Sequence, residues 1–318
     1  GKCSGKLVKN FKITGKYVLT EGAELSVIPE SESYEYTGNA IKPNVKVVAR
    51  IKKNDGSVET KTLRVGVDYA LSYKNNKDVA AVNAVKNGKD IAPQIIIKGK
   101  GSYALGSDKN VGITKKFSID KAKVENLFIT AGDVTYNKKA NAYQKTKISF
   151  ADNGNISRKL AVNKDYKISF KTVGDTQVPE VGQTVMAKIE GIGVNYTGVA
   201  SVSYRIIDPK KDTDISKAKA IINADAKGKT QPCIYTGKAI EPGKKGQPTL
   251  KITVGSGKNL KTLTEGKDFE IVGYLNNIEK GSKAVIIVRG IGECKGIKSF
   301  NFKIDQSDVK NVWGGIYK

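Results

Sequence analysis

The chain has 318 residues, and its 55 lysines and arginines against 31 acidic residues give a formal net charge of +24. This length suits two or three folded domains, and no apolar run approaches the ~18 residues that a membrane-spanning helix requires. Because the chain contains no histidine, it has no Ser-His-Asp or Cys-His triad, no HExxH zinc site and no histidine general base.

Two short phrases recur three times in the same order along the chain. The first is YTGNAIKP at 36–43, which returns as YNKKANAY at 136–143 and as YTGKAIEP at 235–242. Its tyrosines, Tyr36, Tyr136 and Tyr235, are therefore spaced by 100 and 99 residues. The second phrase is GVDYALSY at 66–73, NKDYKISF at 163–170 and GKDFEIVGY at 266–274.

Two further phrases complete each copy. The third is IIIKGKGSY at 95–103, AKIEGIGVNY at 187–196 and IIVRGIGEC at 286–294. Each copy then closes on FSID at 117–120, YRIID at 204–208 or FKID at 302–305. Four phrases in one order, three times over, indicate tandem repetition of one structural unit.

Within a copy, the runs of β-branched and aromatic residues predict strands. Examples are VKVVARI from Val45, IIIKG from Ile95 and FNFKI from Phe300. Asp55-Gly56, inside KNDGS at 53–57, predicts a hairpin turn. About seven strands in ~100 residues predict an all-β chain of three tandem immunoglobulin-like β-sandwich domains. An eight-stranded Greek-key variant fits equally well.

The repeats predict the domain boundaries. Copy one is expected at 20–120, copy two, which is degenerate, at 121–208, and copy three at 209–306. Residues 1–13 align without a gap with 292–304, so we expect 1–19 to hold the closing strands of a preceding repeat and a linker. Residues 307–318 are expected to begin a following segment. The chain is therefore predicted to be cut from a longer array.

The signature residues of the phrases are predicted to be structural. The Tyr-Thr-Gly phrase should turn out of an early strand, and its proline should begin the next extended segment. The Gly-x-Gly phrase should be a tight passage after a core strand. The predicted structural set is Tyr36, Gly38, Pro43, Asp68, Gly99, Gly101, Tyr136, Asp165, Gly191, Gly193, Tyr235, Gly237, Pro242, Asp268, Gly290 and Gly292.

Acidic residues at two places have alternative interpretations. Asp68, Asp165 and Asp268 share one repeated position and are expected to accept backbone N–H bonds in a turn; a cation site or a role in a Lys–Asn isopeptide crosslink is the alternative. A solvated linker is expected to contain Asp208, Asp212 and Asp214, because adjacent lysines oppose cation binding. Calcium binding is the alternative there.

Cysteines in copy three suggest a candidate disulfide. Cys294 occupies the position of Tyr103 and Tyr196, and Cys233 lies two residues before Tyr235. Because copy three alone has cysteine at both apolar positions, a Cys233–Cys294 bridge across the sandwich is one expectation, and two buried thiols are the other. Cys3 holds the corresponding position of the preceding repeat.

The phrases YTGKAIEP, GKDF and GIG and the closing F-x-I resemble the tandem Ig-like repeats of secreted, wall-attached surface proteins of gut Firmicutes, over nearly the whole chain. The resemblance implies an extracellular location, at the cell surface or secreted, in a Gram-positive organism. It implies a spacer or adhesive module without catalytic residues, and we expect no cofactor-binding or metal-binding residues. Copy two lacks the glycine and proline of the first phrase, which leaves its turn geometry open.

Three functions remain after these observations. The leading hypothesis is a stiff stalk with short joints near Asp120 and Asp208. The second is an adhesin that binds a host protein, a glycan or an anionic cell-wall polymer through loops or edge strands. The third is an enzyme that cleaves polysaccharide with two carboxylates, although the chain is expected not to be an enzyme.

Other partners are disfavoured by the pattern of residues. The lysines are spread over outward strand positions without interleaved aromatics, which argues against nucleic acid. Trp313 is interpreted as the first core residue of a following domain, and a sugar-stacking pair of Trp313 and Tyr317 is the alternative. We expect no cofactor and a monomer.

Overall fold

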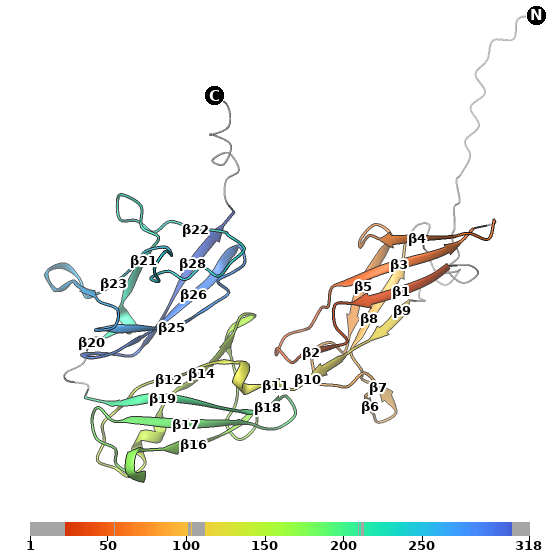
Figure 1. The fold of residues 1–318 in the computed structure, drawn as a ribbon. Coiled ribbons are helices and arrows are strands. Elements are labelled where there is room, and N and C mark those ends of the chain that lie inside the picture. The colour runs from red at the N-terminus through yellow and green to blue at the C-terminus, as the bar shows by residue number, and fades with distance from the viewer. Residues whose placement is uncertain are drawn as a thin grey trace, which may run out of the picture. The chain divides into compact units, whose positions relative to one another are not determined.

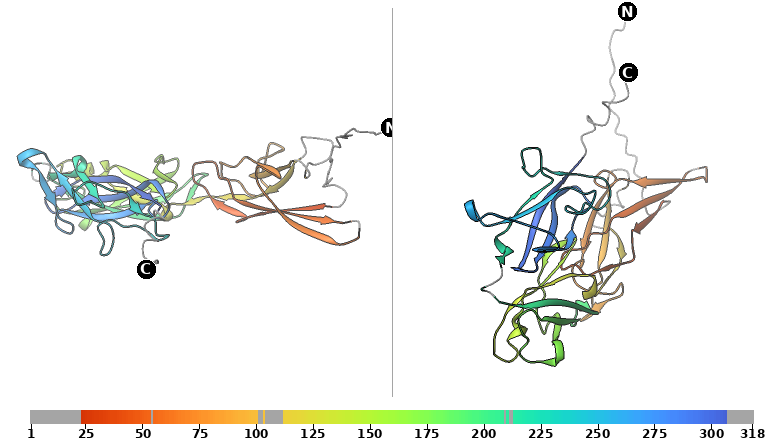
Figure 2. Two further views of the ribbon diagram at one scale, coloured as in Figure 1. Left: turned by 90° about the horizontal axis from the view of Figure 1, so that it is seen from above. Right: turned by 60° about the vertical axis from the view of Figure 1, so that its left-hand side comes forward.

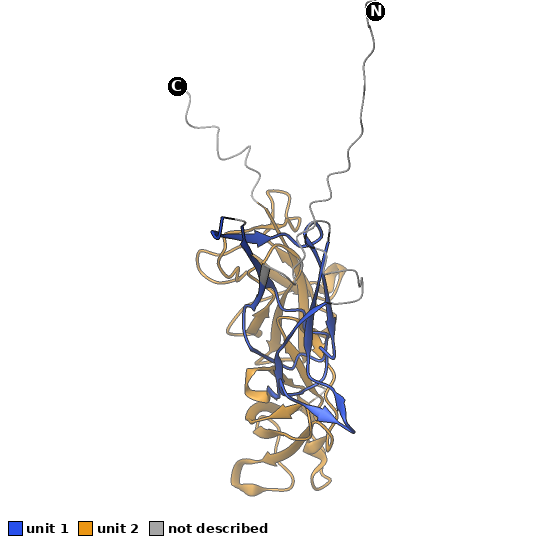
Figure 3. Cartoon of the chain, turned by 90° about the vertical axis from the view of Figure 1, so that its right-hand side faces the viewer, with its two compact units in different colours: residues 1–122 blue, residues 123–318 orange. Residues whose placement is uncertain are grey.

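The computed structural model describes residues 23–53, 55–100, 103, 112–208, 210 and 213–306, and these residues are almost entirely strands and loops, with a few one-turn 3-10 helices (Figure 1). Cys3, Gly101, Asp212, Trp313 and Tyr317 lie outside them, as do the segments 1–19 and 307–318. The chain forms two compact units, residues 1–122 and 123–318 (Figure 3). No helix in the described part of the chain is both long enough and apolar enough to span a membrane.

The first unit contains copy one. One sheet has the order β1-β3-β4, with β1 (Ala23–Pro29), β3 (Val45–Lys52) and β4 (Val58–Leu63). The other has the order β5-β8-β9, with β5 (Tyr69–Lys74), β8 (Gln94–Gly99) and β9 (Ile113–Lys116). Two short pairs complete the unit: β2 (Ser33–Glu35) parallel to β10 (Ser118–Asp120), and the hairpin of β6 (Val85–Lys86) and β7 (Lys89–Asp90).

Alternation along the strands forms the core of copy one. Val47, Ala49 and Ile51 of β3 are buried, and so are Ile95 and Ile97 of β8, and all five belong to one apolar cluster. The residues between them on β3 are exposed or half-buried, as the two-residue period of a strand requires. Between β3 and β4, the pairing of Lys52 with Val58 confirms the predicted hairpin around Gly56, which has a φ of 81°.

The second unit contains copies two and three. The elements of copy two are β11 (Ala122–Lys123), η2 (Val124–Asn126), β12 (Phe128–Ala131), β13 (Val134–Thr135), η3 (Ala142–Lys145), β14 (Ile148–Asp152), β15 (Asn155–Arg158), β16 (Tyr166–Lys171), η4 (Val173–Asp175), β17 (Thr184–Gly191), β18 (Tyr196–Thr197) and β19 (Val199–Ile207). Those of copy three are β20 (Thr213–Asp214), η5 (Ile215–Lys217), β21 (Lys219–Ile222), β22 (Cys233–Ile234), β23 (Leu250–Val254), η6 (Gly257–Asn259), β24 (Lys261–Leu263), β25 (Phe269–Leu275), β26 (Gly281–Gly290), β27 (Cys294–Lys295) and β28 (Ile297–Asp305).

The two copies of the second unit have the same sheet plan. Copy two has a three-stranded sheet β12-β14-β15 and a four-stranded sheet β13-β19-β17-β16, and copy three has β21-β23-β24 and β22-β28-β26-β25. In each copy an early short strand runs parallel to the closing strand, β13 to β19 and β22 to β28, as β2 does to β10 in copy one. Figure 2 shows these sheets from two further directions. The all-β, immunoglobulin-like sandwich prediction is confirmed.

Candidate functional site

In copies one and three, the first phrase is hydrogen-bonded to residues that follow the second phrase. Ile41 donates its N–H to the carbonyl of Asn76 at 2.7 Å, and the Asn76 amide donates back to the Ile41 carbonyl at 2.7 Å. Ile240 and Asn277 make the same reciprocal pair in copy three at 2.8 and 3.1 Å. In copies one and three, this reciprocal contact links the first phrase to the segment just beyond the end of the second.

A tyrosine hydroxyl makes a second contact of the same kind. In copy one, the Tyr73 hydroxyl donates to the carbonyl of Pro43 at 2.7 Å. In copy three, the Tyr274 hydroxyl donates to the carbonyl of Pro242 at 2.8 Å. The tyrosine ends the second phrase and the proline ends the first, so the two phrases close on each other. Burial raises the pKa of both hydroxyls, so each stays protonated and able to donate.

Copy two makes this contact with a different residue. Its carbonyl at the equivalent position belongs to Tyr143, and Phe170, which takes the place of Tyr73, has no hydroxyl. The Tyr204 hydroxyl, which comes from the closing strand β19, donates to the Tyr143 carbonyl at 2.6 Å instead. Phe117 is the corresponding residue of copy one. The hydroxyl has changed its position in the core while its acceptor is retained.

The turn of the first phrase also has a substitute in copy two. In copy one, Thr37 Oγ1 accepts from the N–H of Asn39 at 3.2 Å, and Gly38 has a φ of 77°. In copy two, Asn137 Oδ1 accepts from the N–H of Lys139 at 2.9 Å. An asparagine side chain forms such a local turn as threonine does, so the turn forms without the glycine.

The three repeated aspartates lie within the second phrase and accept hydrogen bonds from the backbone of the turn that leads into it. In each, an Oδ2 atom accepts the N–H of the residue four positions earlier: Asp68 from Arg64 at 2.8 Å, Asp165 from Ala161 at 2.8 Å and Asp268 from Thr264 at 2.9 Å. The hydrogen bond from Thr264 lowers the pKa of Asp268, with help from Lys261 at 3.4 Å. These bonds are those of a turn aspartate.

We expect Asp268→Asn to lower the stability of copy three and to change its acid response. The pKa of Asp268 in the folded chain lies below its ordinary value of 3.8. Its carboxylate therefore stabilises the fold above pH ~4 and stops doing so as the pH falls through the lowered pKa. The variant should lose about 1 kcal/mol of unfolding free energy at pH 7 and should approach the parent chain as the pH falls through the lowered pKa. Denaturant unfolding at several pH values measures this. Glu265→Gln, at an exposed site nearby, is the control, and an equal loss there would contradict the assignment.

The Gly-x-Gly phrase lies directly on the second phrase. Gly193 has a φ of 75°, and a Cβ there would lie 2.5 Å from the carbonyl oxygen of Lys164. The Ile192 N–H donates to the carbonyl of Asp165 at 2.9 Å. Gly292 has a φ of 60° and the same close approach to the Lys267 carbonyl, at 2.6 Å. Glycine is thus required both by the left-handed backbone and by the space.

The candidate disulfide is not formed, and the expectation of a Cys233–Cys294 bridge is corrected. Both residues are buried thiols, and burial raises the pKa of the Cys233 thiol. Cys233 pairs with Ile304 at the end of β28, whereas Cys294 precedes Ile297 at its start. Seven residues of strand span about 23 Å, while a disulfide needs Cα atoms within about 7 Å. The two cysteines belong to opposite ends of the sandwich.

Acidic residues between copies two and three make local turns. Asp208 accepts the N–H of Lys210 at 2.9 Å, and Asp214 accepts the N–H of Ser216 at 2.8 Å. Over the described ranges, no group of three or more His, Cys, Asp or Glu residues is arranged to hold a metal ion.

Copies two and three are joined by an apolar contact between sheet faces, which we call the joint. Ala151 of β14 packs with Leu275 of β25 and with Val285 and Ile287 of β26, and all four are buried. Phe128 of β12 packs against this cluster, and a Cβ at Gly273 would lie 2.5 Å from its ring. A row of modules connected only end to end would lack this contact.

Polar groups close the edges of the joint. Arg205 of copy two forms an ion pair with the nearly buried carboxylate of Asp133 at 2.9 Å. The same Nη2 donates to the carbonyls of Gly290 and Cys294 in copy three, at 2.8 and 3.0 Å. At another edge, the N–H of Asn276 donates to Oδ1 of Asn153 at 3.0 Å. These hydrogen bonds hold the packed sheets of copies two and three in one relative position.

The sequence of copy three is modified at the joint. Leu275 follows the second phrase directly, where copies one and two have Lys74 and Lys171. Ile287 lies three residues before the Gly-x-Gly phrase, where copy two has the exposed Lys188. Lysines on an outward face keep a sheet in water, so their replacement by apolar residues indicates a covered face. The predictions from the sequence did not include this face.

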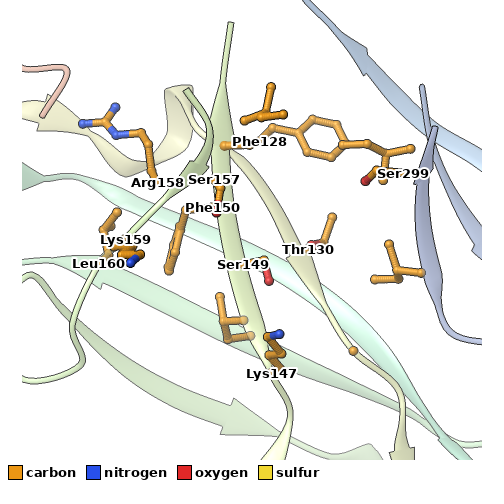
Figure 4. A pocket seen from close by; sticks show the side chains of 16 residues that line it. Phe128, Thr130, Lys147, Ser149, Phe150, Ser157, Arg158, Lys159, Leu160 and Ser299 are labelled. Atoms are coloured by element: carbon orange, nitrogen blue, oxygen red, sulfur yellow. The ribbon is translucent and has the colours of Figure 1, made fainter. Parts of the chain in front are cut away.

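A groove of about 610 Å³ runs along the joint (Figure 4). Its floor comes from the three-stranded sheet of copy two, and Ile287, Ile297 and Ser299 of copy three form one wall. None of the predicted signature residues lines it. The groove has the size of a small-ligand site, and its lining comes from two copies together.

Comparisons with known proteins define no family. No protein-family model matches the chain, and no characterised protein sequence matches it. A solved structure described as "Protocadherin Gamma B2 extracellular cadherin domains 3-6" is 10% identical over 90% of this chain and 76% of its own, with a TM-score of 0.21. The protocadherin GammaB4 extracellular domain is 8% identical over 90% of this chain and 51% of its own, with a TM-score of 0.17. At these values the likenesses say nothing about function.

Proposed function

We propose that the chain is a non-catalytic segment of an extracellular surface protein and that its Ig-like repeats act as a spacer. The supporting observation is what the signature residues bind. The Tyr73 and Tyr274 hydroxyls, the repeated aspartates and the Gly-x-Gly amides all bond within their own copy. Their chemistry closes each module, and none of it is directed at a ligand.

The wall-attached surface proteins that the phrases resemble supply the biological setting of the proposal. In that setting, the chain belongs to a Gram-positive bacterium and holds another domain away from the cell wall. The joint supports a mechanical role, because the Arg205 bonds and the buried apolar cluster restrict bending between copies two and three. An adhesive role is the second candidate, and the groove is the observation that favours it.

Pulling the full chain from its two ends by single-molecule force spectroscopy tests the spacer. We expect three successive unfolding events of similar length, because the three copies share one plan. Releasing about 90 residues should lengthen the tether by about 300 Å each time. A chain that extends without discrete events, or that unfolds in one event, would contradict a row of modules that resist tension.

A further inference from the structure

The groove along the joint is positively charged. Its lining contains Lys147, Arg158 and Lys159 and no acidic residue. The Arg158 side chain is 4% exposed and pairs with Asp152 at 2.7 Å, so its charge is already balanced. Lys147 and Lys159 are exposed, and in the described residues neither has an ion-pair partner within 4.0 Å. Two ammonium groups thus remain available at the groove.

Hydroxyl groups and apolar atoms share the rest of the lining. Four hydroxyl side chains lie along it, those of Thr130, Ser149, Ser157 and Ser299. The Phe128 ring (Figure 4) provides apolar surface beside them, and so does Ile156, which is 49% exposed. Hydroxyls both donate and accept hydrogen bonds, and an aromatic ring packs on the apolar face of a flat ligand. This mixture fits a ligand that carries hydroxyls and negative charge together.

The edge strand beside the groove is poorly suited to pairing with a peptide. The Ser157 N–H donates to Asn155 Oδ1 at 3.1 Å, and the Asn155 N–H donates to Asp152 Oδ1 at 2.7 Å. The register of β15 against β14 is also shifted between Phe150 and Asp152. Side-chain capping and a bulge both protect an edge from strand addition. Recognition in the groove must therefore depend on side chains.

We propose that this groove binds an anionic oligosaccharide, with Lys147 and Lys159 contacting its sulfate or carboxylate groups and the four hydroxyls contacting its sugar hydroxyls. A basic cleft raises the local concentration of an anionic ligand, and the contacts of ammonium with an anion are stronger than neutral hydrogen bonds. Because copy three supplies one wall, the site is complete only while the joint is closed. The activity adds to the proposed spacer and does not depend on it.

Calorimetric titration of the full chain at fixed salt tests the proposal. The probes are a sulfated hexasaccharide, a uronic-acid hexasaccharide, a neutral hexasaccharide and an octaglutamate peptide. We expect at least one anionic sugar to bind about tenfold or more tightly than the neutral sugar, which lacks the charged contacts, and than the peptide, which lacks the sugar hydroxyls. Binding of the sulfated sugar would indicate a host-type sulfated glycan, and binding of the uronic-acid sugar a carboxylated wall polymer.

Charge-reversal variants locate the binding. Lys147→Glu with Lys159→Glu should weaken binding of the anionic sugar about a hundredfold, at about tenfold for each charged contact. Lys171→Glu with Lys188→Glu, on exposed positions of the other sheet of copy two, changes the net charge equally and should alter binding less than about twofold, because it leaves these contacts intact. Equal weakening by both pairs, equal binding of the peptide, or no binding of any sugar would overturn the proposal.

Discussion

Replacing Ile287 with lysine should open the joint while both copies stay folded. Ile287 is 6% exposed and lies among Ala151, Leu275 and Val285. Burying an ammonium group there without a partner costs several kcal/mol, so separating the two faces is the less costly outcome. The equivalent strand of copy two already has Lys188 on an exposed face, which shows that the sandwich itself accepts lysine at this position.

The Ile287→Lys chain should lose unfolding free energy equal to the contribution of the joint, which is about 2–4 kcal/mol for a buried cluster of this size. The chemical shifts of Asn153 and Asn276 report it directly, because their hydrogen bond crosses the joint at 3.0 Å. We expect the chemical shifts of Asn153 and Asn276 to change, while the chemical shifts of the core residues of copy three stay the same. Ile96→Lys, at the half-buried equivalent of copy one, is the matched control. Global unfolding of copy three, or unchanged shifts at the joint, would contradict the account.

Replacing Tyr204 with phenylalanine should destabilise copy two, and Phe170→Tyr should restore much of the loss. Tyr204 is 1% exposed, and its hydroxyl binds the carbonyl of Tyr143 at 2.6 Å. Removing it leaves a buried acceptor without its partner, which costs about 1–3 kcal/mol. Burial raises the pKa of Tyr204, so the hydroxyl is protonated at every pH where the chain is handled.

The double variant reproduces the arrangement of copies one and three, in which the hydroxyl lies at the end of the second phrase. Phe170 is well placed, because its ring centroid is 6.0 Å from that of Tyr143 and 6.4 Å from that of Tyr204. Denaturant unfolding of the parent chain, both single variants and the double variant gives the coupling energy. We expect the double variant to regain more than half of the unfolding free energy that the Tyr204→Phe variant loses. A double variant no more stable than Tyr204→Phe would show that the hydroxyl is not interchangeable.

Features that repeat were predictable from the sequence, because each copy is an independent example of the same position. The strands, the hairpin at Gly56 and the turn role of Asp268 follow from period, turn residues and recurrence. The relocated hydroxyl of Tyr204 was not predictable, because only packing brings β19 to the carbonyl of Tyr143. Of the two expectations for the cysteines, the buried thiols are observed and the disulfide is not. Recurrence identified Cys233 and Cys294 as apolar positions, but it did not show that they lie near opposite ends of β28.

The joint leaves a trace in the sequence of copy three. Residues 284–288 read AVIIV, a run without alternation, which is typical of a strand buried on both faces. Copy one has the similar run III at 95–97, and there Ile96 stays half-buried outside the core cluster. The pattern alone therefore does not distinguish a covered face from a tolerated isoleucine. The presence of Leu275, where copies one and two have lysine, indicates a covered face more specifically.

Residue-resolved hydrogen exchange on the full chain tests the central claim that the repeated phrases are structural. The amides of Lys100, Ile192 and Ile291 donate to the carbonyls of the three repeated aspartates at 2.8, 2.9 and 2.9 Å. If these contacts close each module, the three amides should exchange only when their own copy unfolds globally. Exchange as fast as that of exposed turn amides would mean that the phrases are not part of the folded core, and the proposed spacer would lose its support.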